Sequence, residues 1–166
     1  MTDAQVYAEA AVMGAVAGIR SMSAPAIVGQ LADAGFIPEE GSPVGWLHHP
    51  NVGKAFSVLA SGESLADKLP FLPARTDIGP LAARAITGSV GGAAVCGAAK
   101  RPWWIGALIG AAAAIGASFG ATRVRKWITE QHNVPNAVVG LIEDAVVTGA
   151  GQLIVASFKS DKAIEA

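Results

Sequence analysis

The stretch from Trp103 to Thr122 limits the possible folds more than any other part of this sequence. It reads WWIGALIGAAAAIGASFGAT and contains no charged residue. As a helix it would be about 30 Å long, which is the thickness of the hydrocarbon core of a bilayer. Tryptophans begin the stretch and basic residues follow it, and membrane-spanning helices use such residues to fix their depth. The alternative is an alanine-rich helix in a soluble core, but the length and the flanks favour a membrane span.

The composition agrees with a membrane protein and excludes several functions. Of the 166 residues, 52% are hydrophobic and only 15% are charged, against about 25% charged in typical soluble domains. The net charge is −1 and no basic run occurs, so we expect no nucleic-acid partner. The single Cys96 excludes an intramolecular disulfide. Neighbouring His48 and His49 have no further cysteine or histidine nearby, so we expect a solvated loop and no metal site.

Known catalytic and nucleotide-binding motifs are missing from the sequence. Polar residues suited to catalysis are also few. We therefore expect that the protein is not an enzyme and uses no cofactor.

Five apolar segments predict an all-α, polytopic membrane bundle of about five spans in one domain, 1–166. They lie near residues 6–36, 52–69, 81–99, 103–122 and 137–158. The first segment is interrupted between Arg20 and Pro25, because proline removes a backbone donor and disfavours helix at the preceding Ala24. Two interpretations stay open. Either one spanning helix is kinked or broken near its middle, or a helix ends at Arg20 and an interfacial or re-entrant helix follows.

Five crossings would place the two termini on opposite sides of the membrane. The lysines and arginines are divided almost equally between the two sides and barely favour a cytoplasmic N-terminus. The sequence also predicts a short loop at 129–136, with Pro135 and Asn136 suited to the start of the last helix.

Charged residues inside or near the ends of the apolar segments are the candidate lining of a substrate or ion pathway: Arg20, Glu63, Asp67, Arg84, Glu143 and Asp144. A charge at the bilayer centre costs roughly 2.5–3.5 kcal/mol, so such residues usually face the interior and pair. We expect each arginine to pair with one acidic cluster, and Glu63 to pair with Arg20. Near span ends, snorkelling to the interface is favoured for Asp67 and Arg84. For the deeper Arg20, Glu63 and Glu143, a functional site and a structural ion pair are equally open.

Glycines spaced four residues apart predict close helix packing. The pairs are Gly14/Gly18, Gly88/Gly92, Gly106/Gly110 and Gly116/Gly120. Small residues at this spacing let helix backbones approach one another, and for any single pair packing within the chain is favoured over a dimer seam. Because five thin helices bury little area, we also expect a homo-oligomer. The first and last pairs each precede an arginine, which suggests an inverted repeat with spans one and four antiparallel.

Several of these residues also carry a family resemblance. They are Gly18-Ile19-Arg20, the sequence ESLADKLP from Glu63 to Pro70, Arg84 with Gly88, and Glu143-Asp144 after Pro135-Asn136. In these pieces, from about Gly14 to Ala150, the chain resembles a bacterial membrane family known as domain of unknown function 4126. The resemblance implies an integral membrane protein, expected in a bacterial inner membrane. The matching pieces contain the same charged residues that are the candidate site residues. The resemblance implies no activity.

Two functional hypotheses follow from the charged residues. The first is a small channel or transporter for an ion or small polar solute, with the charged residues lining a polar site between helices. The alternative is a non-transporting membrane scaffold or lipid-binding subunit, in which the same residues form buried ion pairs. The expected partners are the lipid bilayer, further copies of the chain and an unknown small solute or ion.

Overall fold

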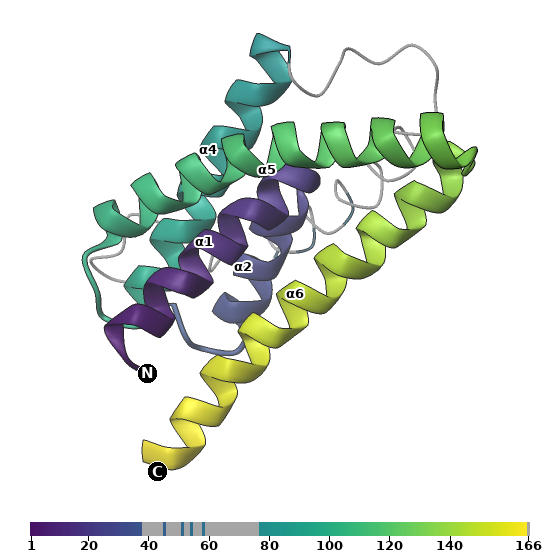
Figure 1. Ribbon diagram of the computed structural model, residues 1–166. Coiled ribbons are helices and arrows are strands. Elements are labelled where there is room, and N and C mark those ends of the chain that lie inside the picture. Colours follow the sequence, from purple (N-terminus) through teal and green to yellow (C-terminus); the bar gives the residue numbers. More distant parts are fainter. Residues whose placement is uncertain (38–44, 46–50, 52–53, 55–57, 59–76, 166) are drawn as a thin grey trace.

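The computed structural model describes residues 1–37, 45, 51, 54, 58 and 77–165. Most of these residues form five helices (Figure 1). The helices are α1 (Asp3–Ile19), α2 (Ser23–Asp33), α4 (Ile78–Ala98), α5 (Trp103–His132) and α6 (Asn136–Glu165). The described part contains no strand, so the predicted all-α bundle is confirmed. Apart from isolated positions, the predicted span at 52–69 lies outside the described residues.

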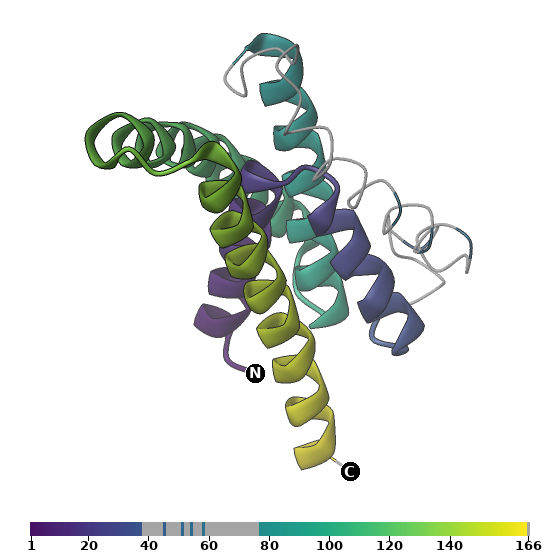
Figure 2. The same ribbon diagram turned by 90° about the vertical axis from the view of Figure 1, so that its right-hand side faces the viewer.

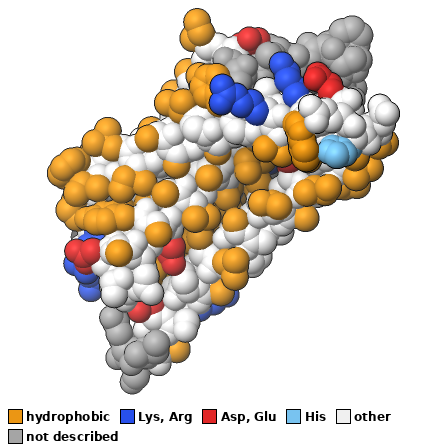
Figure 3. All heavy atoms as spheres, in the orientation of Figure 1, with side chains coloured by type: hydrophobic (Ala, Val, Ile, Leu, Met, Phe, Trp, Pro, Cys, Tyr) orange, Lys and Arg blue, Asp and Glu red, His pale blue; other side chains and the backbone are white. Residues whose placement is uncertain are grey.

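Three of the described helices are long and apolar enough to cross a membrane: α4, α5, and α6 from Asn136 to Ala163. Much of α5 is exposed, including the side chains of Trp104, Leu108 and Phe119. Figure 3 shows hydrophobic side chains spread along this face. An exposed apolar surface of this kind is unfavourable in water and favourable against lipid acyl chains. The chain is therefore a membrane protein, and its apolar helices are not those of a soluble core.

Helix α5 packs directly against α4 through facing glycines. A Cβ atom added to Gly92 would overlap with the backbone of Gly106, and one added to Gly110 would overlap with the backbone of Gly88. The two helices therefore touch backbone to backbone and run antiparallel, since the residue numbers change in opposite directions along the contact. This confirms the predicted close packing for both glycine pairs.

Helix α1 packs on the same part of α5, but in the parallel direction. Gly14 faces the backbone of Gly110, and Gly18 faces the carbonyl of Ala114. Helices α1 and α5 carry the two halves of the supposed inverted repeat, and the repeat requires them to be antiparallel. They run in the same direction, so the similarity of the two glycine pairs that precede an arginine does not indicate an inverted repeat.

The first apolar segment is a helical hairpin. Helices α1 and α2 are joined at residues 20–22 and run in opposite directions (Figures 1 and 2). This agrees with the second interpretation, in which a helix ends at Arg20 and another turns back. Helix α2 has 11 residues and is about 16 Å long, roughly half the thickness of the hydrocarbon core.

Both ends of the chain lie at the same end of the bundle. The amino group of Met1 is 2.6 Å from the carboxylate of Asp161 near the end of α6. The prediction of termini on opposite sides of the membrane is therefore wrong. The physical reason is the hairpin, because the first segment doubles back where a single crossing was expected and this reverses the direction in which the later helices run.

Helix α5 is also longer than its apolar part. It has 30 residues and continues to His132, through the first half of the loop predicted at 129–136. It ends where Asn133 adopts a left-handed conformation with φ of 52°, which asparagine tolerates better than most residues. Helix α6 begins at Asn136, directly after Pro135, as the sequence predicts.

Candidate functional site

The break between α1 and α2 results from the position of Pro25. Proline lacks a backbone donor, which the first turn of a helix does not need. Helix α2 begins at Ser23, so Pro25 falls in this first turn and Ala24 is helical, contrary to the expectation for the residue before a proline. Arg20 has an extended backbone with φ of −136° and ends α1. The chain therefore turns sharply at Arg20 inside the bundle.

Arg20 is buried at this turn and pairs with an acid of α6. Its side chain is 3% exposed, and its Nε lies 2.8 Å from Oδ1 of Asp144. The carboxylate is 31% exposed, so the pair is closed on the arginine side and accessible on the aspartate side. This confirms that Arg20 faces the interior and pairs with an acid. The predicted partner Glu63 lies outside the described residues.

Arg84 of α4 donates hydrogen bonds to the last carbonyls of α1. The last carbonyls of a helix have no partner within it. The Nη1 atom of Arg84 donates to the carbonyl of Gly18 and, at 3.0 Å, to that of Ile19. Arg84 is 4% exposed, so the snorkelling expected for it is wrong. It points inward because its position on α4 faces the end of α1.

Ser118 of α5 supports the same helix end. It is fully buried, and its Oγ donates to the carbonyls of Gly18 at 3.0 Å and of Ala114 at 2.8 Å. Side chains from α4 and α5 therefore both hold the carbonyl of Gly18. Ser118 was not among the predicted site residues, although a lone serine in a stretch of glycine and alanine was a signal for it.

The neighbouring acid of α6 has a different partner. Oε2 of Glu143 lies 3.8 Å from Nη2 of Arg125 on α5, and Arg125 also donates to the carbonyl of Asn136 at 3.5 Å. Arg125 was not among the predicted site residues, because it lies among the basic residues that follow the apolar stretch. The pair lies in an almost wholly apolar cleft of about 300 Å³ between α5 and α6, whose lining includes Val124, Ile128 and Val146.

Gly140 brings the two ion pairs together. A Cβ atom at this position would lie 3.3 Å from Nη2 of Arg125 and 3.9 Å from Nη2 of Arg20. Both guanidinium groups therefore lie next to Gly140 of α6, where the helix has no side chain. With Glu143 and Asp144 just beyond it, they form one charged cluster inside the bundle.

A polar stripe continues from this cluster along α6. Thr148 and Gln152 follow Asp144 at intervals of four residues, and such positions share one face of a helix. With Ser23 and Gln30 of α2 they line a cavity of about 180 Å³. Nε2 of Gln152 donates to Oε1 of Gln30 at 3.2 Å. The four-residue spacing was visible in the sequence, but the stripe was not recognised there.

A family comparison covers all of these residues. The model of the family described as Domain of unknown function (DUF4126) matches residues 8–157. The chain belongs to this family. Neither a curated protein nor a solved structure matches it. The predicted membership in DUF4126 is therefore confirmed, and the function has to be argued from the site.

The predicted site residues of this DUF4126 protein thus divide into three groups. Arg20, Arg84 and Asp144 meet at the break between α1 and α2. Glu143 is adjacent but pairs with α5. Glu63 and Asp67 lie outside the described residues. Among the described residues, no group of three or more histidine, cysteine or acidic side chains is placed to hold a metal ion.

Proposed function

We propose that this protein is a small channel or transporter for an ion or small polar solute, with the charged cluster at the α1–α2 break as its intramembrane site. The observation that supports this most is the stripe of Asp144, Thr148 and Gln152 on a helix apolar enough to cross a membrane. Polar residues within membrane helices are costly and often mark pathways for ions or solutes. Here the stripe leads from a cavity toward the charged cluster.

The Arg20–Asp144 pair has an asymmetry that suits a binding site. Arg20 is held inside the protein, whereas nearly a third of the Asp144 side chain is accessible. A cation reaching Asp144 would replace part of the interaction with Arg20, and an anion would compete with Asp144 for Arg20. Broken helices that place polar groups within the membrane serve the same purpose in many transporters.

Flux through the purified protein in liposomes tests this proposal. A panel of monovalent ions, protons and small polar solutes is compared between protein-containing and empty vesicles. Asp144→Asn keeps the shape of the side chain and removes its charge, so we expect it to lower the flux at least about tenfold, as for loss of a charged contact worth roughly 1.4 kcal/mol or more. Asp33→Asn is the matched control, because Asp33 is exposed at the end of α2. Flux that is equal in all variants, or no greater than in empty vesicles, would contradict the proposal.

The alternative function is a non-transporting scaffold or lipid-binding subunit. The apolar cleft between α5 and α6, with the Arg125–Glu143 pair in it, favours this second candidate. In that case the Arg20–Asp144 pair is purely structural. Asp144→Asn would then lower the melting temperature in detergent, and Arg20→Gln would partly restore it, since the double variant leaves no unpaired charge. Wild-type liposomes would show no flux.

The proposal has three further parts. The protein catalyses no reaction, it resides in a bacterial inner membrane, and it forms a homo-oligomer. The support for self-association is the pair Gly116 and Gly120, because a Cβ atom at either position would meet none of the described residues within 4 Å. These glycines leave a bare strip on α5 that a helix of a second copy could approach closely.

A further inference from the structure

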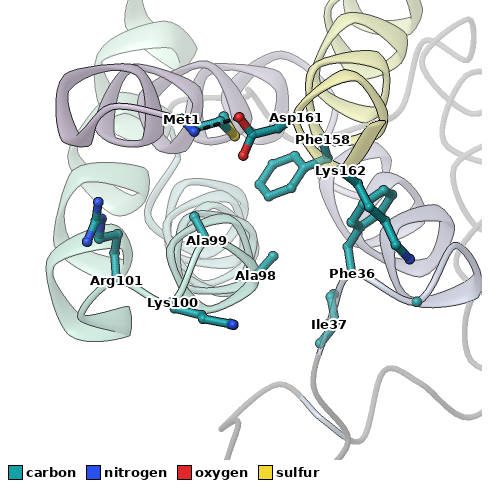
Figure 4. Close-up of a pocket in the computed structure, with 11 residues that line it drawn as sticks. Met1, Phe36, Ile37, Ala98, Ala99, Lys100, Arg101, Phe158, Asp161 and Lys162 are labelled. Carbon is teal, nitrogen blue, oxygen red and sulfur yellow. Dashed lines mark hydrogen bonds and ion pairs between the residues drawn. The ribbon is translucent and has the colours of Figure 1, made fainter. Parts of the chain in front are cut away.

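The end of the bundle that holds both termini contains a pocket outside the charged cluster (Figure 4). Its volume is about 560 Å³, within the range typical of small-molecule sites. The ends of α2, α4 and α6 surround it. Its lining combines Phe36, Ile37 and Phe158 with basic residues that include Lys100 and Lys162.

Nearby carboxylates are already engaged, whereas two lysines are not. Asp161 binds the amino group of Met1 at 2.6 Å, and Asp3 binds Arg101 at 2.6 Å. Lys100 and Lys162 form no ion pair with any carboxylate in the described part of the chain. The ammonium group of Lys162 instead lies 5.4 Å from the ring centroid of Phe36. Asp161 is the one carboxylate in the described lining of the pocket, and it is held by Met1, so the charges of Lys100 and Lys162 are not neutralised by an ion pair in the described residues.

Lys100 occupies a position where glycine is usually preferred. Its φ is 56°, in the left-handed region. The amides of Lys100 and Arg101 donate to the carbonyls of Gly97 at 3.0 Å and Cys96 at 2.8 Å, the pattern of a helix end whose left-handed residue is most often glycine. A lysine there strains the backbone, and its side chain lines the pocket. The strain is consistent with a functional need for the side chain.

Beside Lys162, part of the pocket's lining is apolar. The rings of Phe36 and Phe158 lie 5.6 Å apart in a tilted arrangement, and Ile37 and Ala98 also line the pocket. A ligand that fits this lining carries a negative charge next to apolar groups. Lysines bind phosphate well as point charges, and a phosphate group carries up to two negative charges.

We infer that this pocket binds a phosphate-bearing ligand, with its phosphate between Lys100 and Lys162 and its apolar part against Phe36 and Phe158. The phosphate has two possible sources, a phospholipid headgroup or a soluble phosphate compound. Binding here does not depend on the proposed transport activity, because the pocket shares no residue with the charged cluster or with the polar stripe.

Thermal unfolding of the full chain in detergent tests the inference. The probes are dioctanoyl phosphatidylglycerol, dioctanoyl phosphatidylcholine and inorganic pyrophosphate, each titrated at constant ionic strength. We expect an anionic probe to raise the melting temperature in a saturable way. Lys100→Gly and Lys162→Gln should each weaken its apparent affinity about fivefold, the typical contribution of one basic residue near an anionic lipid surface. Lys126→Gln is the control, since this exposed residue of α5 does not line the pocket.

The Lys100→Gly variant separates loss of binding from loss of fold. Glycine relieves the strained backbone, so without ligand this variant should melt at a higher temperature than the wild type. Phosphatidylglycerol acting alone would assign the site to a lipid headgroup, and pyrophosphate acting would assign it to a soluble phosphate. The inference is overturned if no anionic probe stabilises the protein. It is also overturned if the pocket variants respond like the wild type, or if Lys126→Gln weakens binding equally.

Discussion

Helix α5 carries the same glycine motif twice, in opposite environments, in a crowded first half that runs to Ala114 and an open second half that begins at Ile115. In the first half, Gly106 and Gly110 lie against the backbone of α4, with no room for a side chain. In the second half, a Cβ atom added to Gly116 or Gly120 would meet nothing within 4 Å in the part of the chain that the structure describes. Helices α1 and α4 both contact the first pair, whereas beyond Ser118 α5 continues past the end of α1 (Figure 1). The spacing of glycines thus indicates where a helix can be approached closely, and the topology decides whether anything does so.

The largest expected effect is at Gly110, in the crowded half. In Gly110→Leu the new side chain would overlap with the carbonyl of Gly88, and a backbone atom cannot move aside as a flexible side chain can. We expect a loss of more than about 3 kcal/mol, at the upper end for overpacked sites. Melting temperature and the yield of monodisperse protein in detergent measure it. A variant as stable as the wild type would show that the α4–α5 contact is looser than described.

A smaller effect is expected at Ser118, the buried residue between Gly116 and Gly120. Ser118→Ala removes the hydroxyl that donates to Gly18 while Arg84 keeps its own hydrogen bonds to the end of α1. We expect a loss of about 1 kcal/mol, the typical net value of one hydrogen bond. Thermal unfolding of the single variant and of the double variant with Arg84→Gln checks this. The double variant should lose more than the sum, because both changes leave the same carbonyl unsatisfied.

Gly116→Leu is the matched counterpart of Gly110→Leu in the open half. It introduces the same side chain where nothing lies within 4 Å, so we expect a change in stability of less than about 0.5 kcal/mol. If this face contacts a second copy, the substitution should shift the protein toward the monomer. Light scattering after size-exclusion chromatography in detergent measures the shift. A strongly destabilised monomer would mean that the two halves do not differ in the way described.

The smallest effect is expected at the far end of the open half. Asn133 ends α5 with φ of 52°, a conformation in which glycine is less strained than asparagine. Asn133→Gly should therefore stabilise the protein by a few tenths of a kcal/mol. The change should appear as a small rise in melting temperature with unchanged oligomeric state. A fall would show that the Asn133 side chain makes a contact that matters more than the backbone strain.

Much of the fold follows from local sequence signals. The uncharged stretch that begins at Trp103 predicted a membrane helix, and Pro135 predicted the start of the last one. Pro25 predicted an interruption near Arg20. These features depend on backbone chemistry and on hydrophobic length, which are properties of neighbouring residues. They can therefore be inferred without knowing the tertiary structure.

The partners of the charged residues could not be predicted in the same way. Arg84 points inward because α1 happens to end beside it, and its hydrogen bonds join residues far apart in the sequence. Glu143 and Asp144 are neighbours, yet one faces α5 and the other faces the α1–α2 break. The direction of α2 after Arg20 depends on packing as well. A single sequence does not show which distant helix faces come into contact, so these pairings follow only from the tertiary structure.

The way in which α1 ends has a consequence for the order of assembly during synthesis. The carbonyl of Gly18 is held by Arg84, which is 66 residues further along the chain, and by Ser118, which is 100 residues further. At roughly 5–20 residues per second, about 5–20 s pass between the synthesis of Gly18 and that of Ser118. Until then this helix end lacks the side chains that make it tolerable in lipid. The first hairpin of the chain must therefore be among the last parts of the protein to reach its final place.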